Sequence, residues 1–196
     1  MNDLDKTLHI QTEGIQVNGK DTFHNHRYEP TPYEVLDQVF STYPLQKEDV
    51  LVDYGCGKGR LNFYLHDRFG CQTVGVEFSK EYYEDACNNL LTYGGSHQGS
   101  DKISFHHICA QDYPVQPKET HFYFFNPFSL PIFMKTVTNI IRSHETHPRE
   151  ITLLMYYPDA EYLYYLEFYT PFEPLLEIPV GNLAKDSREC FVLYRM

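Results

Sequence analysis

The sequence predicts an α/β fold in which a mostly parallel sheet is covered by helices on both faces. From residue 50 onward, short β-branched and aromatic runs alternate with segments of helical periodicity. Such alternation is typical of parallel strands joined by crossover helices. The 196 residues suit one domain that is large enough to bury this sheet. We therefore expect three layers built around seven strands.

The expected elements follow in chain order. An Asn-Gly pair at 18–19, a strong hairpin signal, predicts a small β-hairpin over about residues 8–23. A helix should begin at Pro32 with Thr31 as its N-cap, and end near Tyr43. Strands are expected at 50–52, 72–77, 103–108, 120–125, 151–156, 172–178 and 190–194, and helices at 59–69, 79–93, 131–142 and up to about 169. Residues 1–30 are interpreted as an N-terminal extension, and 31–196 as the α/β domain.

The stretch from Val50 to Leu61 carries the strongest functional signal. A buried strand ends at Asp53, and glycines follow at 55, 57 and 59 before helical spacing begins. Glycine allows positive φ and lets a ligand lie directly on the backbone. The first turn of the next helix presents free N–H groups that attract anionic groups. A nucleotide-like ligand is therefore expected on this strand–turn–helix unit.

Two phosphate-binding patterns fit this stretch poorly. A dinucleotide site needs G-x-G-x-x-G, but Arg60 stands where the last glycine belongs, and no Gly-Lys-Ser/Thr of a Walker loop is present. Asp53 with Gly55, Gly57 and Gly59 instead resembles the Asp-x-Gly-x-Gly-x-Gly of class I, Rossmann-like S-adenosylmethionine (SAM)-dependent methyltransferases. The resemblance covers roughly 31–196. It implies a seven-stranded sheet with an antiparallel last strand, SAM as cofactor and S-adenosylhomocysteine (SAH) as product.

The resemblance also implies cofactor contacts from residues at the ends of three strands, namely Asp53, Gly55, Cys56, Gly57, Gly59, Glu77, Phe78, Gln111 and Asp112. The glycine loop would hold the methionyl part. Glu77 lies 24 residues after Asp53, and a carboxylate can accept hydrogen bonds from both ribose hydroxyls. Phe78 would pack on the adenine, and Asp112 would accept from its amino group. The alternative for Glu77 is a surface acid that caps the next helix. The alternative for Asp112 is an Asx turn.

Asn126-Pro127-Phe128 resembles a shortened Asn-Pro-Pro-Tyr/Phe motif of amino-group methyltransferases. The resemblance implies that Asn126 and the Pro127 carbonyl accept hydrogen bonds from the target amine, with Asn126 also in reach of SAM, and that Phe128 stacks on a planar acceptor. The second proline is missing, which argues against recognition of a nucleobase. An Asn-Pro turn at a strand end is the alternative. Further candidates, either lid and pocket residues or packing aromatics, are Tyr28, Tyr33, Tyr156 and Tyr157. The tyrosine-rich run at 155–165 is otherwise typical of a core or a subunit interface.

Charge and composition restrict the partners. The chain has 16 basic and 27 acidic residues, a net charge of −11, and no basic run. Nucleic-acid binders usually carry a basic face, so a small-molecule or basic protein acceptor is favoured. The five cysteines are scattered, which argues against disulfides and a zinc ribbon, and the ten histidines form no legible metal site. With no long apolar run and no signal-peptide pattern, we expect a cytoplasmic protein away from membranes.

The sequence thus predicts a cytoplasmic SAM-dependent methyltransferase whose acceptor is a nitrogen atom on a small molecule or a protein. Catalysis needs little acid–base chemistry, because the sulfonium is already a strong electrophile and the enzyme mainly aligns the reactants. The first alternative is a SAM-binding protein without catalysis, such as a sensor or partner subunit. The second, a nucleotide-dependent oxidoreductase, is disfavoured by Arg60. The oligomeric state is left open.

Overall fold

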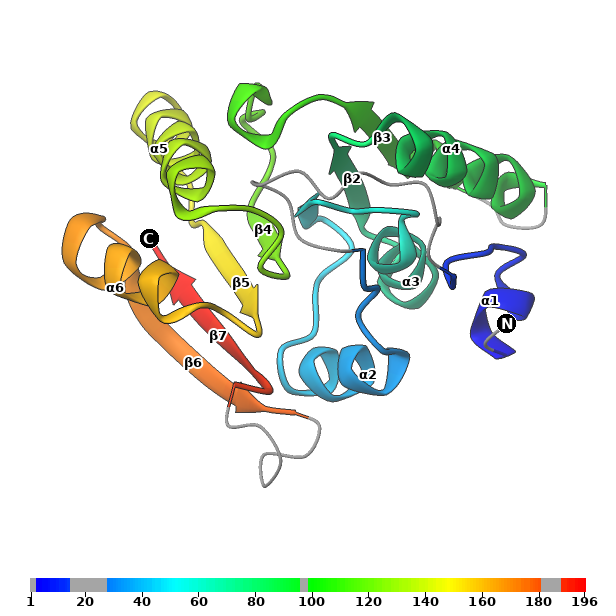
Figure 1. Ribbon diagram of the computed structural model, residues 1–196, viewed down its shortest axis with the longest axis horizontal. Coiled ribbons are helices and arrows are strands. Elements are labelled where there is room, and N and C mark those ends of the chain that lie inside the picture. Colours follow the sequence, from blue (N-terminus) through cyan, green and yellow to red (C-terminus); the bar gives the residue numbers. More distant parts are fainter. Residues whose placement is uncertain (1–2, 15–27, 96–98, 181–187) are drawn as a thin grey trace.

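The computed structural model describes residues 3–14, 28–95, 99–180 and 188–196, and it confirms the α/β prediction (Figure 1). Within these ranges one seven-stranded sheet has the order β3-β2-β1-β4-β5-β7-β6. The strands are β1 (Val50–Tyr54), β2 (Gln72–Glu77), β3 (Ile103–His107), β4 (His121–Phe124), β5 (Thr152–Tyr156), β6 (Glu173–Pro179) and β7 (Cys190–Arg195). The strands β1 to β5 pair in parallel, and β7 is antiparallel to both β5 and β6.

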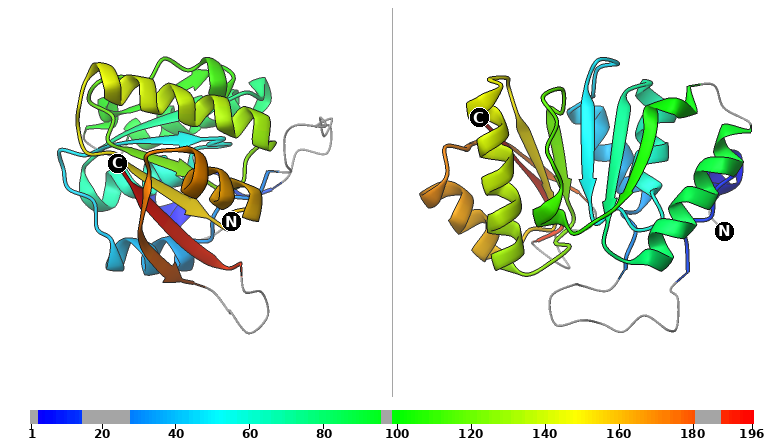
Figure 2. Two further views of the ribbon diagram at one scale, coloured as in Figure 1. Left: turned by 90° about the vertical axis from the view of Figure 1, so that its left-hand side faces the viewer. Right: turned by 90° about the horizontal axis from the view of Figure 1, so that it is seen from above.

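Helices cover both faces of this sheet. They are α1 (Asp3–Thr7), α2 (Tyr33–Thr42), α3 (Arg60–Phe69), α4 (Lys80–Gly94), α5 (Leu130–Thr146) and α6 (Ala160–Tyr169), with 3₁₀ turns η1 (Ser100–Lys102) and η2 (Ala110–Asp112). The left-hand view of Figure 2 places α5 above the sheet and α2 below it. Phe133 and Leu166 bring α5 and α6 into one core layer, while Leu36 and Leu65 bring α2 and α3 into the other. The helix α4 packs beside α3, with the rings of Tyr93 and Phe63 5.1 Å apart.

The burial of the central strands explains why their positions could be predicted from the sequence. Every residue of β1, β4 and β5 is buried. Strands that are buried on both faces need nearly continuous apolar side chains, and these appear in the sequence as uninterrupted runs. The edge strand β6 is mostly exposed. None of the described helices combines the length and the apolar character that a membrane span requires.

Two local predictions for the N-terminal part are wrong. Residues 8–14 form neither helix nor strand, so no hairpin begins at residue 8; the rest of the predicted hairpin lies outside the described residues. Thr31 does not cap α2, which begins at Tyr33 with Pro32 as its N-cap. Instead, the Thr31 hydroxyl is hydrogen-bonded to the Tyr123 hydroxyl at 2.6 Å. A tertiary contact has replaced the local cap. The boundary between an extension and a domain at residue 30 stays a prediction.

Candidate functional site

The candidate site lies where the order of the strands reverses. From β1 the chain moves outward to β2 and β3, and it returns to the other side of β1 with β4. Ligands of open α/β sheets bind at this position, outside the carboxyl ends of the strands. The loops that follow β1 and β4 are in close contact there: a Cβ placed on Gly55 would lie 2.7 Å from Cβ of Pro127. The two sequence motifs are therefore adjacent in space.

Glu77 supports the glycine loop directly. Its carboxylate accepts a hydrogen bond from the Gly57 amide at 2.9 Å and another from the Ser79 amide at 2.7 Å. Burial raises the pKa of Glu77, and the hydrogen bonds that it accepts from the backbone oppose this rise. Each carboxylate oxygen can accept a second hydrogen bond. Glu77 can thus fix the loop and still receive hydroxyl groups.

Asp53 is a second buried acid at this edge. It is the penultimate residue of β1 and lies between Gly75 of β2 and Tyr123 of β4 in the register of the sheet. Burial, and after it the neighbouring charge of Glu77, raises the pKa of Asp53 well above its usual value. Burial likewise raises the pKa of Cys56, which favours its neutral thiol form. Two buried carboxyl groups at one loop suit a ligand rich in hydroxyl and ammonium donors.

Tyr28 lies on the glycine loop. A Cβ on Gly57, whose φ is +54°, would fall 2.1 Å from Cε2 of the Tyr28 ring. The Tyr28 hydroxyl donates to the Thr12 carbonyl at 2.6 Å, and its ring packs 4.8 Å from that of Tyr82. Tyr33, by contrast, is buried and donates its hydroxyl to Asp5 at 2.5 Å. Tyr28 therefore packs on the loop, whereas the Tyr33 side chain contacts Asp5 and Arg60.

Arg60 is the residue that sequence reasoning missed as a site candidate. Its Nε donates to Thr12 Oγ1 at 2.7 Å, its Nη1 donates to the Thr31 carbonyl at 3.3 Å, and its guanidinium lies 4.6 Å from the centre of the Tyr33 ring. Its Nη2 is buried without a hydrogen-bond partner among the described residues. The partners of Arg60 are up to 48 residues away in the chain, so no local pattern could have revealed this arrangement.

Asn126 is the most unusual residue on the β4 side. Its φ is +39°, and its buried amide oxygen has no hydrogen-bond partner in the part of the chain that the structure describes. Asparagine enters the left-handed region more readily than most residues, but a buried acceptor left unpaired is costly. Phe128 is buried, and its ring packs edge-on against that of Phe124 at 6.2 Å. Its ring therefore lies in the core beneath the turn.

Tyr156 and Tyr157 form an aromatic wall at the end of β5. The Tyr156 ring lies 4.5 Å from Phe125 and is stacked on Phe191. Burial, then the charges of Glu189 and Glu29, raise the pKa of Tyr156 to about 12. Tyr157 has a φ of +49°, which is rare for a bulky residue. A guanidinium group, that of Arg188, lies 4.5 Å from the centre of the Tyr157 ring.

Comparison with known proteins establishes the family. Residues 7–120 match the family described as histone methylation protein DOT1. The chain belongs to the DOT1 family. It is 33% identical over 88 residues to a geranyl diphosphate 2-C-methyltransferase of Saccharopolyspora erythraea, an alignment of 44% of this chain and 28% of that protein. It is 31% identical over 68 residues to a protein-lysine N-methyltransferase of Saccharolobus islandicus, which covers 34% of this chain and 42% of that protein. The chain thus spans less than half the length of either relative.

A solved structure places the same fold beside its cofactor product. An RNA methyltransferase of Salinibacter ruber in complex with SAH superimposes with a TM-score of 0.60 at 18% identity, over 85% of this chain and 92% of that one. The fold class and the family resemblance predicted from the sequence are therefore confirmed. The DOT1-family fold explains why the glycine loop, Glu77 and Asn126 meet at one edge.

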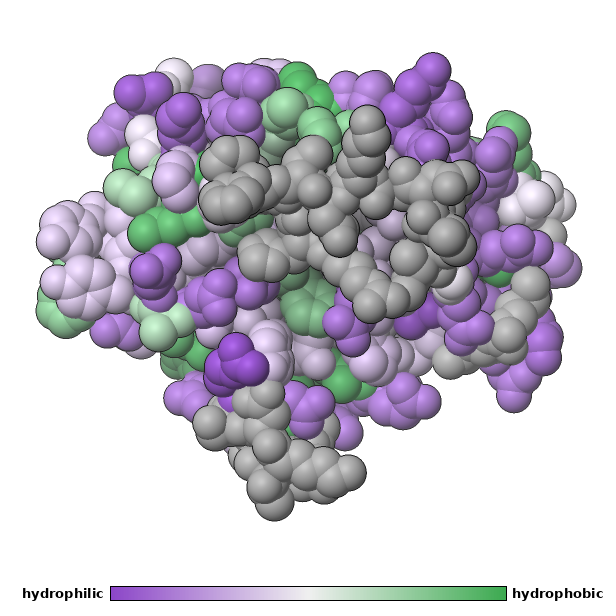
Figure 3. All heavy atoms as spheres, viewed as in Figure 1, coloured by the Kyte–Doolittle hydropathy of each residue, from purple (hydrophilic) through white to green (hydrophobic). Residues whose placement is uncertain are grey.

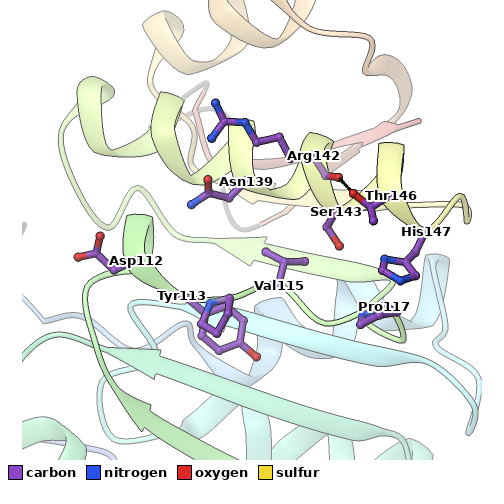
Figure 4. A pocket seen from close by; sticks show the side chains of 10 residues that line it. Asp112, Tyr113, Val115, Pro117, Asn139, Arg142, Ser143, Thr146 and His147 are labelled. Atoms are coloured by element: carbon purple, nitrogen blue, oxygen red, sulfur yellow. Dashed lines mark hydrogen bonds between the residues drawn. The ribbon is translucent and has the colours of Figure 1, made fainter.

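The predicted adenine contacts of this DOT1-family protein lie at the rim of the site. The Phe78 side chain is 48% exposed, and its carbonyl accepts from His107 Nε2 at 3.0 Å. The Gln111 carbonyl accepts from Asn139 Nδ2 at 2.7 Å, which joins η2 to α5. Asp112 is exposed and lines a groove of about 420 Å³ between η2 and α5, where Figure 4 shows its carboxylate pointing away from Tyr113. Their roles stay predictions. Within the described ranges, no three side chains of His, Cys, Asp or Glu gather as a metal site.

Proposed function

We propose that this DOT1-family protein transfers a methyl group from SAM to a nitrogen atom of a cationic acceptor, on a protein or a small molecule. The observation that carries the proposal is Asn126. Its buried amide oxygen is unpaired among the described residues, and the following proline touches the glycine loop. A buried acceptor that is unpaired in the free protein indicates that a donor arrives with a ligand. An acceptor amine is such a donor.

The residues of the site fit SAM. Asp53 and Glu77 offer buried carboxylates to its ammonium and ribose hydroxyl groups. The unpaired Arg60 Nη2, at the N-terminus of α3, suits the methionyl carboxylate, since both the guanidinium group and the helix end favour an anion. Binding of SAM would thus give interaction partners to buried polar groups, which are costly to leave unpaired.

SAM supplies a methyl group that is already activated on a sulfonium centre. The acceptor's ammonium group first releases one proton to solvent, and the protein then presents the neutral amine. The nitrogen lone pair forms the N–C bond as the S–C bond breaks and SAH leaves. Asn126 would accept an N–H hydrogen bond and so aim the lone pair toward the methyl group. Alignment of this kind supplies much of the rate enhancement of two-substrate reactions.

The surroundings favour an acceptor that arrives with a positive charge. Phe125, directly after β4, and Tyr156, the last residue of β5, have rings 4.5 Å apart, and Glu29 and Glu189 lie close enough to raise the pKa of Tyr156. Aromatic rings and carboxylates attract ammonium groups. The Saccharolobus relative, whose name specifies protein lysine, supports a nitrogen acceptor. The net charge of −11 argues against RNA.

The test is transfer of tritium from methyl-labelled SAM to a lysine-rich protein, a free alkylamine, an RNA and geranyl diphosphate. We expect transfer to the amines. Asn126→Gly, which tolerates the positive φ but removes the amide, should lower kcat about a hundredfold, comparable to the loss of one transition-state hydrogen bond. The Kd for SAH should be unchanged. Asn88→Gly, at an exposed position of α4, is the control.

Three outcomes would contradict the proposal. Transfer to RNA or to geranyl diphosphate alone would exclude a nitrogen acceptor of the proposed kind. SAH binding without transfer to any acceptor would favour a non-catalytic SAM-binding protein. An unchanged kcat in Asn126→Gly would remove Asn126 from the reaction even if amines are methylated.

A further inference from the structure

The outer surface of α6 carries large aromatic side chains in contact with solvent. Tyr164, Phe168 and Tyr169 are 57%, 66% and 67% exposed. Their rings touch one another, with centroids 4.8 Å apart for Tyr164 and Phe168 and 5.9 Å apart for Tyr164 and Tyr169. In Figure 3 the left-hand edge of the molecule, where Figure 1 places α6, shows pale lilac and green spheres. A contiguous cluster of exposed rings is typical of an interaction site, whereas single exposed apolar residues are not.

A groove continues this surface toward the edge of the sheet. It has a volume of about 540 Å³ and is lined by the end of α6, the turn after it and the start of β6: Glu167, Phe168, Thr170, Pro171, Phe172, Glu173 and Pro174. Leu176 of β6 adds a further apolar side chain that is 38% exposed. We call the rings of Tyr164, Phe168 and Tyr169, together with this groove, the aromatic face.

Acidic side chains predominate around the aromatic face. The segment from 157 to 180 contains five acidic residues and no lysine or arginine; the acids are Asp159, Glu161, Glu167, Glu173 and Glu177. The nearest base on the neighbouring strand, Arg195, lies opposite Glu173 in the sheet and forms an ion pair with Glu150 at 3.5 Å. One oxygen of Glu167 accepts from the Tyr194 hydroxyl. The remaining charge is available to a partner.

We propose that the aromatic face docks a segment of another protein that is rich in basic and aliphatic side chains. Aliphatic groups fill the groove, and arginine or lysine side chains lie over the rings and beside the carboxylates. A second copy of this chain fits less well, because it would bring like charges together. Addition of a strand to the sheet edge also fits less well, because β6 carries Pro174 and Pro179 and an irregular register between Pro174 and Leu176.

The aromatic face shares no residue with the candidate site. Binding at the aromatic face can therefore be measured without a methyl donor. The proposal therefore does not depend on which acceptor is methylated.

The test is fluorescence anisotropy of a labelled peptide of arginine and leucine, titrated with the 196-residue protein in the absence of any methyl donor. We expect saturable binding that weakens about tenfold in Phe168→Ser, equivalent to about 1.4 kcal/mol. Leu91→Ser is the matched control, since Leu91 is also apolar and 75% exposed but lies on α4. Glu173→Gln should weaken binding and reduce its dependence on salt, unlike Glu48→Gln at an exposed position before β1.

Equal weakening by Phe168→Ser and Leu91→Ser, or no weakening by either, would overturn the proposal. So would equal binding of a peptide in which glutamate replaces arginine. A wild-type dimer in sedimentation that dissociates in Phe168→Ser would assign the face to a second copy. An unchanged thermal shift by SAH in each variant verifies that the fold is intact.

Discussion

On the β1–β2–β3 side of the site, polar groups hold one another in place: Glu77 binds the glycine loop, and Arg60 joins Thr12 to Thr31. On the β4–β5 side, Asn126 and Tyr157 both have left-handed backbones, and the Asn126 amide oxygen is unpaired among the described residues. The match to the DOT1 family ends at residue 120, one residue before β4. The part of the chain that matches the family therefore contains the glycine loop and Glu77, the proposed cofactor side of the site, but not Asn126 or Tyr157. The proposed acceptor side holds two non-glycine residues with positive φ, whereas buried atoms without a hydrogen-bond partner among the described residues occur on both sides, with Arg60 Nη2 on one and Asn126 Oδ1 on the other.

The largest effect should come from the cofactor side. Gly57→Ala places a Cβ within 2.1 Å of the Tyr28 ring at a φ of +54°. We expect SAH binding, measured by calorimetry, to weaken about a hundredfold or more, because the loop or the ring must move. Gly14→Ala is the control, since its φ is +85° but nothing lies within 4 Å of the new Cβ. It should lose about 1 kcal/mol of stability through backbone strain and keep its SAH affinity. Equal losses of affinity would mean that strain, not the contact with Tyr28, matters.

A smaller effect on SAH affinity should come from a change of pH. Burial raises the pKa of Asp53 in the free protein, and the ammonium group of the ligand favours its ionised form. SAH affinity should therefore fall about tenfold per pH unit once the pH drops below this raised pKa. Asp53→Asn should flatten the profile and weaken binding at neutral pH. Glu119→Gln is the control, because Glu119 is also buried with a raised pKa but is bound to Tyr113 and Gln116. A flattened binding profile in Glu119→Gln would contradict this assignment.

The same Asp53 substitution should stabilise the unliganded protein. A carboxyl group whose pKa is raised by folding binds its proton more tightly in the native state. Stability is therefore lost as the pH rises from the ordinary carboxyl pKa through the raised one, and it stays lower at neutral pH. Asp53→Asn removes this loss, so the thermal midpoint without ligand should rise at pH 7. A lower midpoint would show that the Asp53 carboxylate holds the fold together.

The smallest effect should come from the rim. Asp112→Ala would remove the predicted hydrogen bond to adenine at an exposed position, so SAH affinity should fall only about threefold to tenfold. Asp101→Ala, an exposed acid on the other 3₁₀ turn, should leave SAH binding unchanged. If both variants bind SAH like the wild type, Asp112 has no contact with adenine and serves only its turn.

The sequence predicted most of the fold because its signals are local. Apolar runs located each strand within a few residues. The assignment of the glycine loop to the cofactor stays a prediction. Thr31 could not be assigned from sequence, because its partner Tyr123 is 92 residues away. The positive φ of Asn126 could not be predicted either, because asparagine also adopts ordinary backbone angles. The tyrosine-rich run divides in a similar way: Tyr162 is buried in the core, while Tyr164 two residues later is exposed.

The position of β7 has a consequence for how the chain assembles during translation. β6 leaves the ribosome before β7, yet its pairing in the sheet is with β7, which separates it from β5. Until β7 emerges, the edge of β5 is open and β6 has no strand to join. We expect β6 and β7 to pair first as a hairpin and then add to β5 as a unit. A nascent chain stalled between the two strands should thus expose an edge open to incorrect pairing.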